Sequence, residues 1–138
     1  MKTWIFQGKP ERYDLKTQLQ VGKIETWLVT RYREQMQKGC IVYLWRSGDR
    51  DERGLYGWGR IISKEAKYYT DWGWGIDVEY VVRFNPIISI STIEEHGLLK
   101  NNLLLRMPIG TNFELSAEEA NQLAELIRAK GQQGPPSL

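Results

Sequence analysis

The chain has 138 residues, 41% hydrophobic and 26% charged, with a formal net charge of only +2. This size and composition fit one soluble globular domain that can hold a core without metals or disulfides. The balanced charge excludes a general phosphate binder, so any contact with nucleic acid must be local and chemically specific. Cys40 is the only cysteine, which excludes an intramolecular disulfide and favours a reducing, cytoplasmic location. No apolar run approaches the roughly 18 residues of a membrane-spanning helix, so no membrane partner is expected.

The first half of the chain predicts strands separated by short helices. Residues 3–6 and 24–29 have the composition of strands. A short helix is predicted over residues 11–20, where Pro10 suits the first turn. Residues 30–39 predict a second helix, with Thr30 as the N-cap and Gly39 as the C-terminal stop.

The central part of the chain predicts the core of a sheet. Residues 40–46 form a nearly continuous apolar run, which indicates a strand buried on both faces. Residues 54–62 predict its antiparallel partner, whose interleaved glycines allow close backbone approach or a bulge. A loop rich in tyrosine and tryptophan is predicted over residues 64–75. A long alternating strand follows over residues 76–84, and Asn85-Pro86 is predicted to end it.

The last third predicts mainly helices. A short helix is expected over residues 92–97, residues 98–105 fit either a helical turn or a strand, and residues 108–113 predict a loop. Ser116 and Glu119 form a capping box that begins a helix reaching Lys130. The order of elements indicates an α+β domain with a curved, mainly antiparallel sheet. Residues 1–130 are predicted as that domain, and residues 131–138 as a flexible tail or linker.

Residues that support an enzyme are scarce. The one histidine, His96, is predicted at an exposed helix end, and Cys40 begins a buried strand. The glycines of residues 54–59 belong to a strand and not to a phosphate-binding turn. We therefore predict no catalytic residues, no metal and no cofactor.

Three stretches resemble the EVE family of PUA-like domains. Residues 4–10 (Trp-Ile-Phe-Gln-Gly-Lys-Pro) are similar to the family's opening strand, Trp-x-Phe and a polar turn. Residues 27–47 are similar to its Trp-x-Val, short helix, Gly-Asp-x-Val and strand ending in Ser, although Cys40 replaces the usual Asp. Residues 54–61 are similar to its Gly-x-x-Gly-x-Gly/Ala strand. Residues 110–120 resemble the end of EVE-like domains, including those joined to restriction-type ATPases.

The resemblance implies a PUA-like fold, with a curved, mostly antiparallel sheet or barrel flanked by short helices, related to YTH and ASCH domains. It implies a non-catalytic module that binds DNA or RNA by accepting one flipped, modified cytosine or adenine between aromatic walls. Flipping a base costs a few kcal/mol, and stacking on an aromatic side chain returns about 1–3 kcal/mol. An effector protein such as a restriction-type ATPase or nuclease is an implied partner, in restriction or defence.

On this interpretation we predict two sets of binding residues. Trp27, expected at an exposed entry to a helix, is the first candidate for the aromatic side chain on which the base stacks. Each tryptophan also fits ordinary packing in the core. The predicted base pocket contains Trp27, Val29, Thr30, Trp45, Ser47, Trp58 and Asn112. The predicted phosphate contacts are Arg31, Arg46 and Arg60.

Two other functions remain open. One is a PUA-like RNA-binding protein that acts on tRNA or rRNA. The other is a small ASCH-like nucleoside amidohydrolase that uses Lys, Thr and Glu, although no spacing in this chain identifies such a set.

Overall fold

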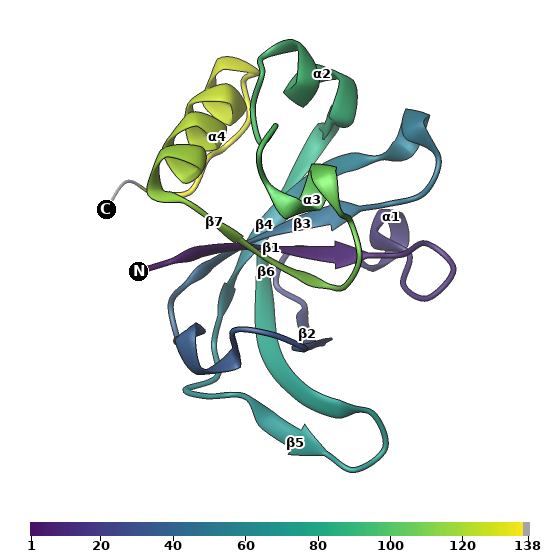
Figure 1. Ribbon diagram of the computed structural model, residues 1–138, viewed down its shortest axis with the longest axis vertical. Helices are drawn as coiled ribbons and strands as arrows, with labels where there is room; N and C mark the ends of the chain where they lie inside the picture. The colour runs from purple at the N-terminus through teal and green to yellow at the C-terminus, as the bar shows by residue number, and fades with distance from the viewer. Residues whose placement is uncertain (137–138) are drawn as a thin grey trace.

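A seven-stranded mixed sheet curls into a half-barrel in the computed structural model, which describes residues 1–136 (Figure 1). The strand order is β2-β6-β4-β3-β1-β7, and β5 pairs with β6 outside this path. The pairing of β1 with β3 is parallel and the other pairings are antiparallel. The strands are β1 (Thr3–Gly8), β2 (Ile24–Leu28), β3 (Ile41–Arg46), β4 (Gly54–Ile61), β5 (Lys67–Tyr69), β6 (Gly73–Ser89) and β7 (Asn112–Leu115).

The helices are short, except for the one near the end of the described chain. They are α1 (Leu15–Gln18), α2 (Ile90–Glu95), α3 (Leu103–Arg106) and α4 (Ala117–Ala129), with 3₁₀ turns η1 (Arg33–Gln35) and η2 (Arg50–Glu52). The predicted capping box of α4 is confirmed, because Ser116 Oγ accepts from the Glu119 backbone N–H and Glu119 Oε1 accepts from that of Ser116. No helix within residues 1–136 is long and apolar enough to cross a membrane. This α+β fold with a curled sheet confirms the predicted PUA-like architecture.

Two hydrophobic clusters pack on opposite faces of the sheet. Successive side chains of a strand point to opposite faces, and β3 follows this rule closely. Tyr43 and Trp45 join one cluster, together with side chains of α2, α3 and α4, whereas Val42 and Leu44 join the other. The predicted burial of both faces of this strand is confirmed, and it makes β3 the centre of the domain.

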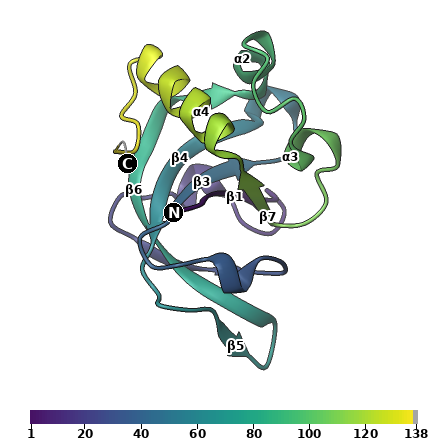
Figure 2. The ribbon, with the colours of Figure 1, turned by 60° about the vertical axis from the view of Figure 1, so that its left-hand side comes forward.

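Strand β6 is much longer than the sequence predicts. It runs for 17 residues, along nearly the full height of the molecule (Figure 2), and Asn85-Pro86 does not end it. Its pairing with β4 jumps from Gly57–Arg83 to Leu55–Ile88, so Pro86 lies in an irregular stretch. A proline has no backbone N–H to donate to a neighbouring strand, and an irregular stretch does not require that hydrogen bond.

The predicted helix over residues 30–39 is wrong. Only the 3₁₀ turn η1 forms there, and Thr30 does not cap it, because the turn begins at Arg33 and its N-cap position is Tyr32. Tyr32 adopts a left-handed conformation with φ of 62°, which interrupts any helix, and its ring packs on Trp4. The long-range contacts of this segment therefore override its helical pattern.

Other boundaries also shift. The first helix begins at Leu15 with Asp14 as its N-cap, so it is shorter than predicted. The predicted loop at residues 64–75 contains β5 and the start of β6, and the loop at residues 108–113 contains the start of β7. The open choice over residues 98–105 resolves as a turn followed by α3, which the Asn102 side chain caps.

Part of the segment predicted as a flexible tail contacts the domain. The Trp58 indole N–H donates to the carbonyl of Gln133, and an Arg128 guanidinium N–H donates to that of Pro135. Residues 137–138 of the predicted tail lie outside the described residues.

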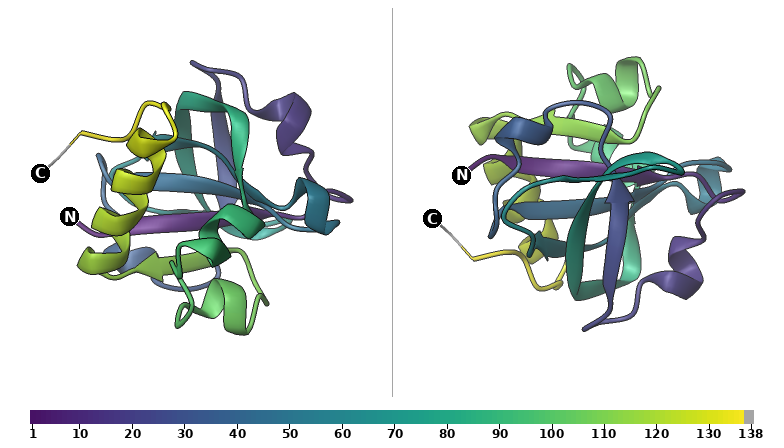
Figure 3. Two further views of the ribbon diagram at one scale, coloured as in Figure 1. Left: turned by 90° about the horizontal axis from the view of Figure 1, so that it is seen from above. Right: turned by 90° about the horizontal axis from the view of Figure 1, so that it is seen from below.

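Asn112 connects the two strands at opposite ends of the strand order. Strand β2 runs across the direction of β1 (Figure 3), which brings the end of β2 close to β7. The fully buried Asn112 side chain of β7 accepts from the Thr30 N–H at 2.9 Å and donates to the Leu28 carbonyl at 3.1 Å. One amide group therefore satisfies a backbone donor and a backbone acceptor where β2 ends.

Replacing Asn112 with alanine should destabilise the domain by about 2–6 kcal/mol. The substitution leaves a backbone N–H and a carbonyl without partners, each at a cost of about 1–3 kcal/mol. Urea unfolding of Asn112→Ala measures the loss, and the exposed Asn101→Ala serves as the matched control. Equal stability of the two variants would contradict the role given to Asn112.

Candidate functional site

A pocket of about 380 Å³ lies beside this junction. The end of β1 and the loop after it form one wall, β2 forms a second, and the loop before β7 forms a third. The volume falls within the range of about 300–1,000 Å³ that is usual for small-ligand sites. The lining residues are Gln7, Gly8, Lys9, Arg12, Tyr13, Glu25, Thr26, Trp27, Leu28, Thr30, Gly110 and Thr111. We call this site the β1–β2 pocket.

The aromatic floor of the β1–β2 pocket is continuous with the core. Trp27 is only 6% exposed, and its ring packs against Phe6 and edge-on against Tyr13, with centroids 5.9 and 5.2 Å away. Trp27 therefore serves the core and the pocket at once.

A chain of hydrogen bonds crosses the floor with a fixed direction. The Trp27 indole N–H donates to Tyr80 Oη at 3.0 Å, the two tyrosine hydroxyls lie 2.7 Å apart, and Tyr13 Oη donates to Glu25 Oε2 at 3.0 Å. Because a carboxylate only accepts hydrogen bonds, the Tyr13 hydroxyl donates to Glu25 and accepts a hydrogen bond from the Tyr80 hydroxyl. The chain thus runs from Trp27 to Glu25 and orients the carboxylate.

Burial raises the pKa of both tyrosines, Tyr13 and Tyr80. Burial raises the pKa of Tyr80 to about 12, although the hydrogen bond from the Trp27 indole acts in the opposite direction. Burial also raises the pKa of Tyr13, and its contacts with Tyr80 and Glu25 add to that rise. Both phenols therefore stay neutral at physiological pH and keep the hydrogen-bond chain intact.

Polar groups surround the rim of the β1–β2 pocket. The Gln7 amide N–H donates to the carbonyls of Gly110 and Pro108, at 2.9 and 3.3 Å, which fixes the loop that leads into β7. Lys9 and the exposed Arg12 add two cations. The site therefore combines an apolar floor, hydrogen-bonding groups and positive charge.

The structure brings some of the predicted pocket residues together. Trp27 and Thr30 line the β1–β2 pocket, and Asn112 lies behind its wall, where the backbone contacts at Leu28 and Thr30 occupy both ends of its amide. Val29 points into the core and is 2% exposed. Asn112 therefore shapes the pocket, and its amide is not free to bind a base edge.

The remaining predicted pocket residues lie elsewhere. Trp45 and Ser47 line a smaller pocket of about 160 Å³, together with residues of α2 and α3. Trp58 is buried in the cluster on the face of the sheet opposite Trp27. A single base cannot contact all three predicted tryptophans.

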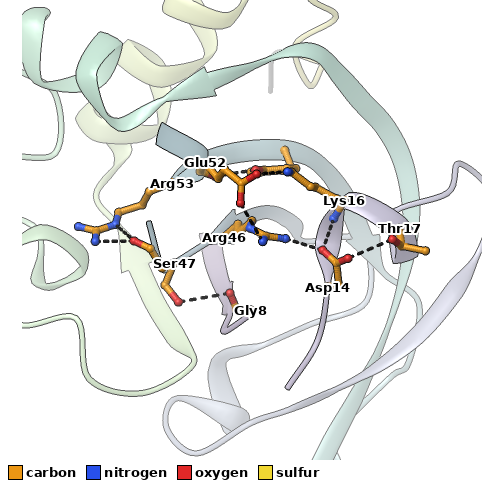
Figure 4. Close-up of polar contacts among 10 residues, drawn as sticks. Gly8, Asp14, Lys16, Thr17, Arg46, Ser47, Glu52 and Arg53 are labelled. Carbon is orange, nitrogen blue, oxygen red and sulfur yellow. Dashed lines mark hydrogen bonds and ion pairs between the residues drawn. The ribbon is translucent and has the colours of Figure 1, made fainter. Parts of the chain in front are cut away.

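The predicted phosphate contacts are engaged with protein groups. The buried Arg46 guanidinium pairs with Asp14 and, at 3.2 Å, with Glu52 (Figure 4). A hydrogen bond from Thr17 and the pairing with Arg46 hold the pKa of Asp14 below its ordinary value, and Lys16 and Arg46 lower the pKa of Glu52 in the same way. Arg46 therefore fastens α1 and η2 to β3.

The other two predicted phosphate-binding arginines, Arg31 and Arg60, also contact protein groups. An Arg31 guanidinium N–H donates to the Asn112 carbonyl at 3.3 Å, and the Arg60 guanidinium lies 5.6 Å from the Trp58 ring. Neither lines the β1–β2 pocket.

Sequence reasoning missed several residues of this pocket. One signal was available for Glu25, because residues two apart in a strand share a face, so Glu25 accompanies Trp27 on β2. Arg12 and Tyr13 gave no such signal, because the loop that carries them was predicted to be a helix.

The protein is therefore an α+β domain with a curled sheet and an aromatic pocket beside the junction of the two outer strands. The EVE domain model matches residues 2–126. The chain belongs to the EVE domain family, as the sequence motifs predict.

Solved structures share this fold at low sequence identity. Human THYN1, crystallised in complex with 5-methylcytosine-containing DNA, is 20% identical with a TM-score of 0.69, over 91% of this chain and 97% of that one. A protein from Agrobacterium tumefaciens is 16% identical with a TM-score of 0.73, over 99% and 98%. One from Leishmania major is 16% identical with a TM-score of 0.72, over 96% and 98%. No curated protein matches the chain.

The raised pKa of Tyr80 predicts that the folded domain loses stability at alkaline pH. An unfolded tyrosine ionises near pH 10 and folded Tyr80 near 12, so the unfolded state loses its proton first. The stabilisation is complete below about pH 10 and falls as the pH approaches 12. The stability difference between the wild type and Tyr80→Phe should shrink by up to about 2 kcal/mol over this range. Urea unfolding at several pH values measures it, with the exposed Tyr68→Phe as the control; a constant difference would contradict the assignment.

Proposed function

We propose that this protein is a non-catalytic nucleic-acid-binding module that holds one flipped, modified base, a cytosine or adenine derivative, in the β1–β2 pocket. The observation that carries the proposal is the pocket itself, in which the Trp27 floor meets hydrogen-bonding groups and two cations. The family and the likeness to human THYN1, which was crystallised with 5-methylcytosine-containing DNA, support nucleic acid as the ligand.

The pocket suits a base better than it suits a phosphate. Its floor is apolar and aromatic, so a base plane and an added methyl group leave water when they contact Trp27 and Tyr13. The carboxylate of Glu25 at the same site disfavours an anion. The base therefore enters the pocket, and the backbone phosphates remain outside.

Lys9 and Arg12 are the proposed phosphate contacts. Both lie at the β1–β2 pocket, and neither has an ion pair with another described residue. They replace Arg31, Arg46 and Arg60 in the proposal, because those side chains contact protein groups near other parts of the fold.

A hydrolase of the ASCH type is the second candidate, because the pocket gathers Lys9, Glu25 and Thr26. The Thr26 hydroxyl, however, donates to Asp77 at 2.6 Å, and no hydrogen bond joins it to Lys9. Within residues 1–136 no group of His, Cys, Asp and Glu side chains is arranged to hold a metal. These contacts favour binding without catalysis. Release of acetate from N4-acetylcytidine would instead establish the hydrolase.

The family resemblance alone suggests an effector partner, an ATPase or nuclease that acts in defence. RNA is an alternative to DNA as the ligand. Matched DNA and RNA oligonucleotides distinguish the two nucleic acids directly, because a protein that requires RNA contacts the 2′-hydroxyl.

Trp27→Phe should weaken binding to an oligonucleotide that carries the preferred modified base by at least about threefold, because it shrinks the stacking surface. Phenylalanine is preferred to alanine here, since truncating the buried ring would cost about 3–5 kcal/mol of stability. Trp58→Phe is the matched control, because that buried indole also donates one hydrogen bond but lies on the other face. Fluorescence anisotropy with 5-methylcytosine, N6-methyladenine and unmodified oligonucleotides measures the effect. Equal losses in both variants would contradict the pocket assignment.

Arg12→Gln should weaken binding to modified and unmodified oligonucleotides by the same factor. A phosphate contact carries no base information, and its loss should reduce the slope of log K against log salt by about 1. Lys130→Gln removes the same charge at the end of α4 and should leave the slope unchanged. A change in base preference in Arg12→Gln would show that Arg12 contacts the base instead.

A further inference from the structure

We propose that Glu25 determines which bases the β1–β2 pocket accepts, by taking a hydrogen bond from an exocyclic amino group on the edge of the base. The inference rests on the proposed function and gives the physical cause of its preference for cytosine and adenine derivatives. Bases that present an amino group there, as cytosine and adenine derivatives do, are bound; bases that present a keto oxygen, as thymine and uracil do, are rejected.

One carboxylate oxygen of Glu25, Oε2, is held by protein groups, and the other, Oε1, is left to contact a ligand. Oε2 accepts from Tyr13 Oη at 3.0 Å and pairs with Lys23 Nζ at 3.0 Å. Oε1 has no hydrogen-bond partner within residues 1–136. The residue lies on β2 two positions before Trp27, so both side chains lie on the same face of the strand and both line the pocket.

The contact with Tyr13 uses Glu25 as an acceptor. Tyr13 Oη donates to Oε2, so the Tyr13 hydroxyl accepts from Tyr80, which itself accepts from the Trp27 indole. The ion pair with Lys23 places a second donor at Oε2. A ligand that approaches Oε1 therefore meets a group that accepts hydrogen bonds and has none to donate.

An acceptor at this position distinguishes an amino group from a keto group. A cytosine presents its N4 amino group as a donor, and carboxylates are a recognised partner of that group. A thymine has the same ring and the same 5-methyl group as 5-methylcytosine, but it presents O4, whose lone pairs would face a carboxylate oxygen. This unfavourable contact adds to the loss of the hydrogen bond.

The experiment compares 5-methylcytosine with thymine in one DNA duplex. Each target base is placed opposite an abasic site, so that neither pairs and flipping costs differ little. Fluorescence anisotropy gives both affinities for the wild type, Glu25→Gln and Glu79→Gln. Glu79 lies on the neighbouring strand β6 and outside the pocket lining, so the last variant controls for loss of the same charge.

The wild type and Glu79→Gln should prefer 5-methylcytosine to thymine by about tenfold, the factor that corresponds to one charge-assisted hydrogen bond of about 1.4 kcal/mol. In Glu25→Gln the amide oxygen accepts from Tyr13 and the amide N–H₂ takes the place of Oε1. That variant should lose the preference or favour thymine.

Two results overturn the inference in different ways. Unchanged discrimination in Glu25→Gln, or equal binding of the two bases by the wild type, would reject the role of Glu25 and leave the pocket proposal standing. Failure of the wild type at low salt to bind either duplex, and to bind single-stranded DNA or RNA that carries 5-methylcytosine or N6-methyladenine, would reject both proposals.

Discussion

The side chain of Asn112 holds together the part of the fold on which the candidate site depends. A curled sheet that stops short of closing into a barrel has two outer strands, and here one buried amide joins β7 to the backbone at the end of β2. The β1–β2 pocket lies beside this junction. The same contact holds the end of β2 beside β7 and so keeps two walls of the pocket, β2 and the loop before β7, next to each other.

The second constraint is that the pocket floor and the core share side chains. Trp27 belongs to the cluster that includes Phe6 and Tyr80, and its indole N–H begins the hydrogen-bond chain that reaches Glu25. A preorganised floor lowers the cost of ordering side chains when a ligand binds. It also means that substitutions at Trp27 affect stability and binding together, so matched control variants are needed to separate the two effects.

The sequence predicted features set by local pattern and missed those set by distant contacts. The apolar run of β3 and the capping box at Ser116 could be predicted, because their causes lie within a few residues. The pairing of Thr30 with Asn112 spans 82 residues, and no local pattern encodes it. The continuation of β6 through Pro86 depends on a register shift against β4. For the site, Trp27 was identifiable from its motif, but the partners of Arg46 were visible only in three dimensions.

The central claim is that the ligand enters the β1–β2 pocket, and the six tryptophan indole N–H groups report on it directly. Two-dimensional ¹H–¹⁵N spectra recorded during titration with a 5-methylcytosine oligonucleotide follow each indole separately. The account predicts that the Trp27 signal shifts with the bound fraction, while the Trp58 signal on the opposite face stays in place. Shifts confined to Trp45, in the smaller pocket, or to Trp58 would contradict it.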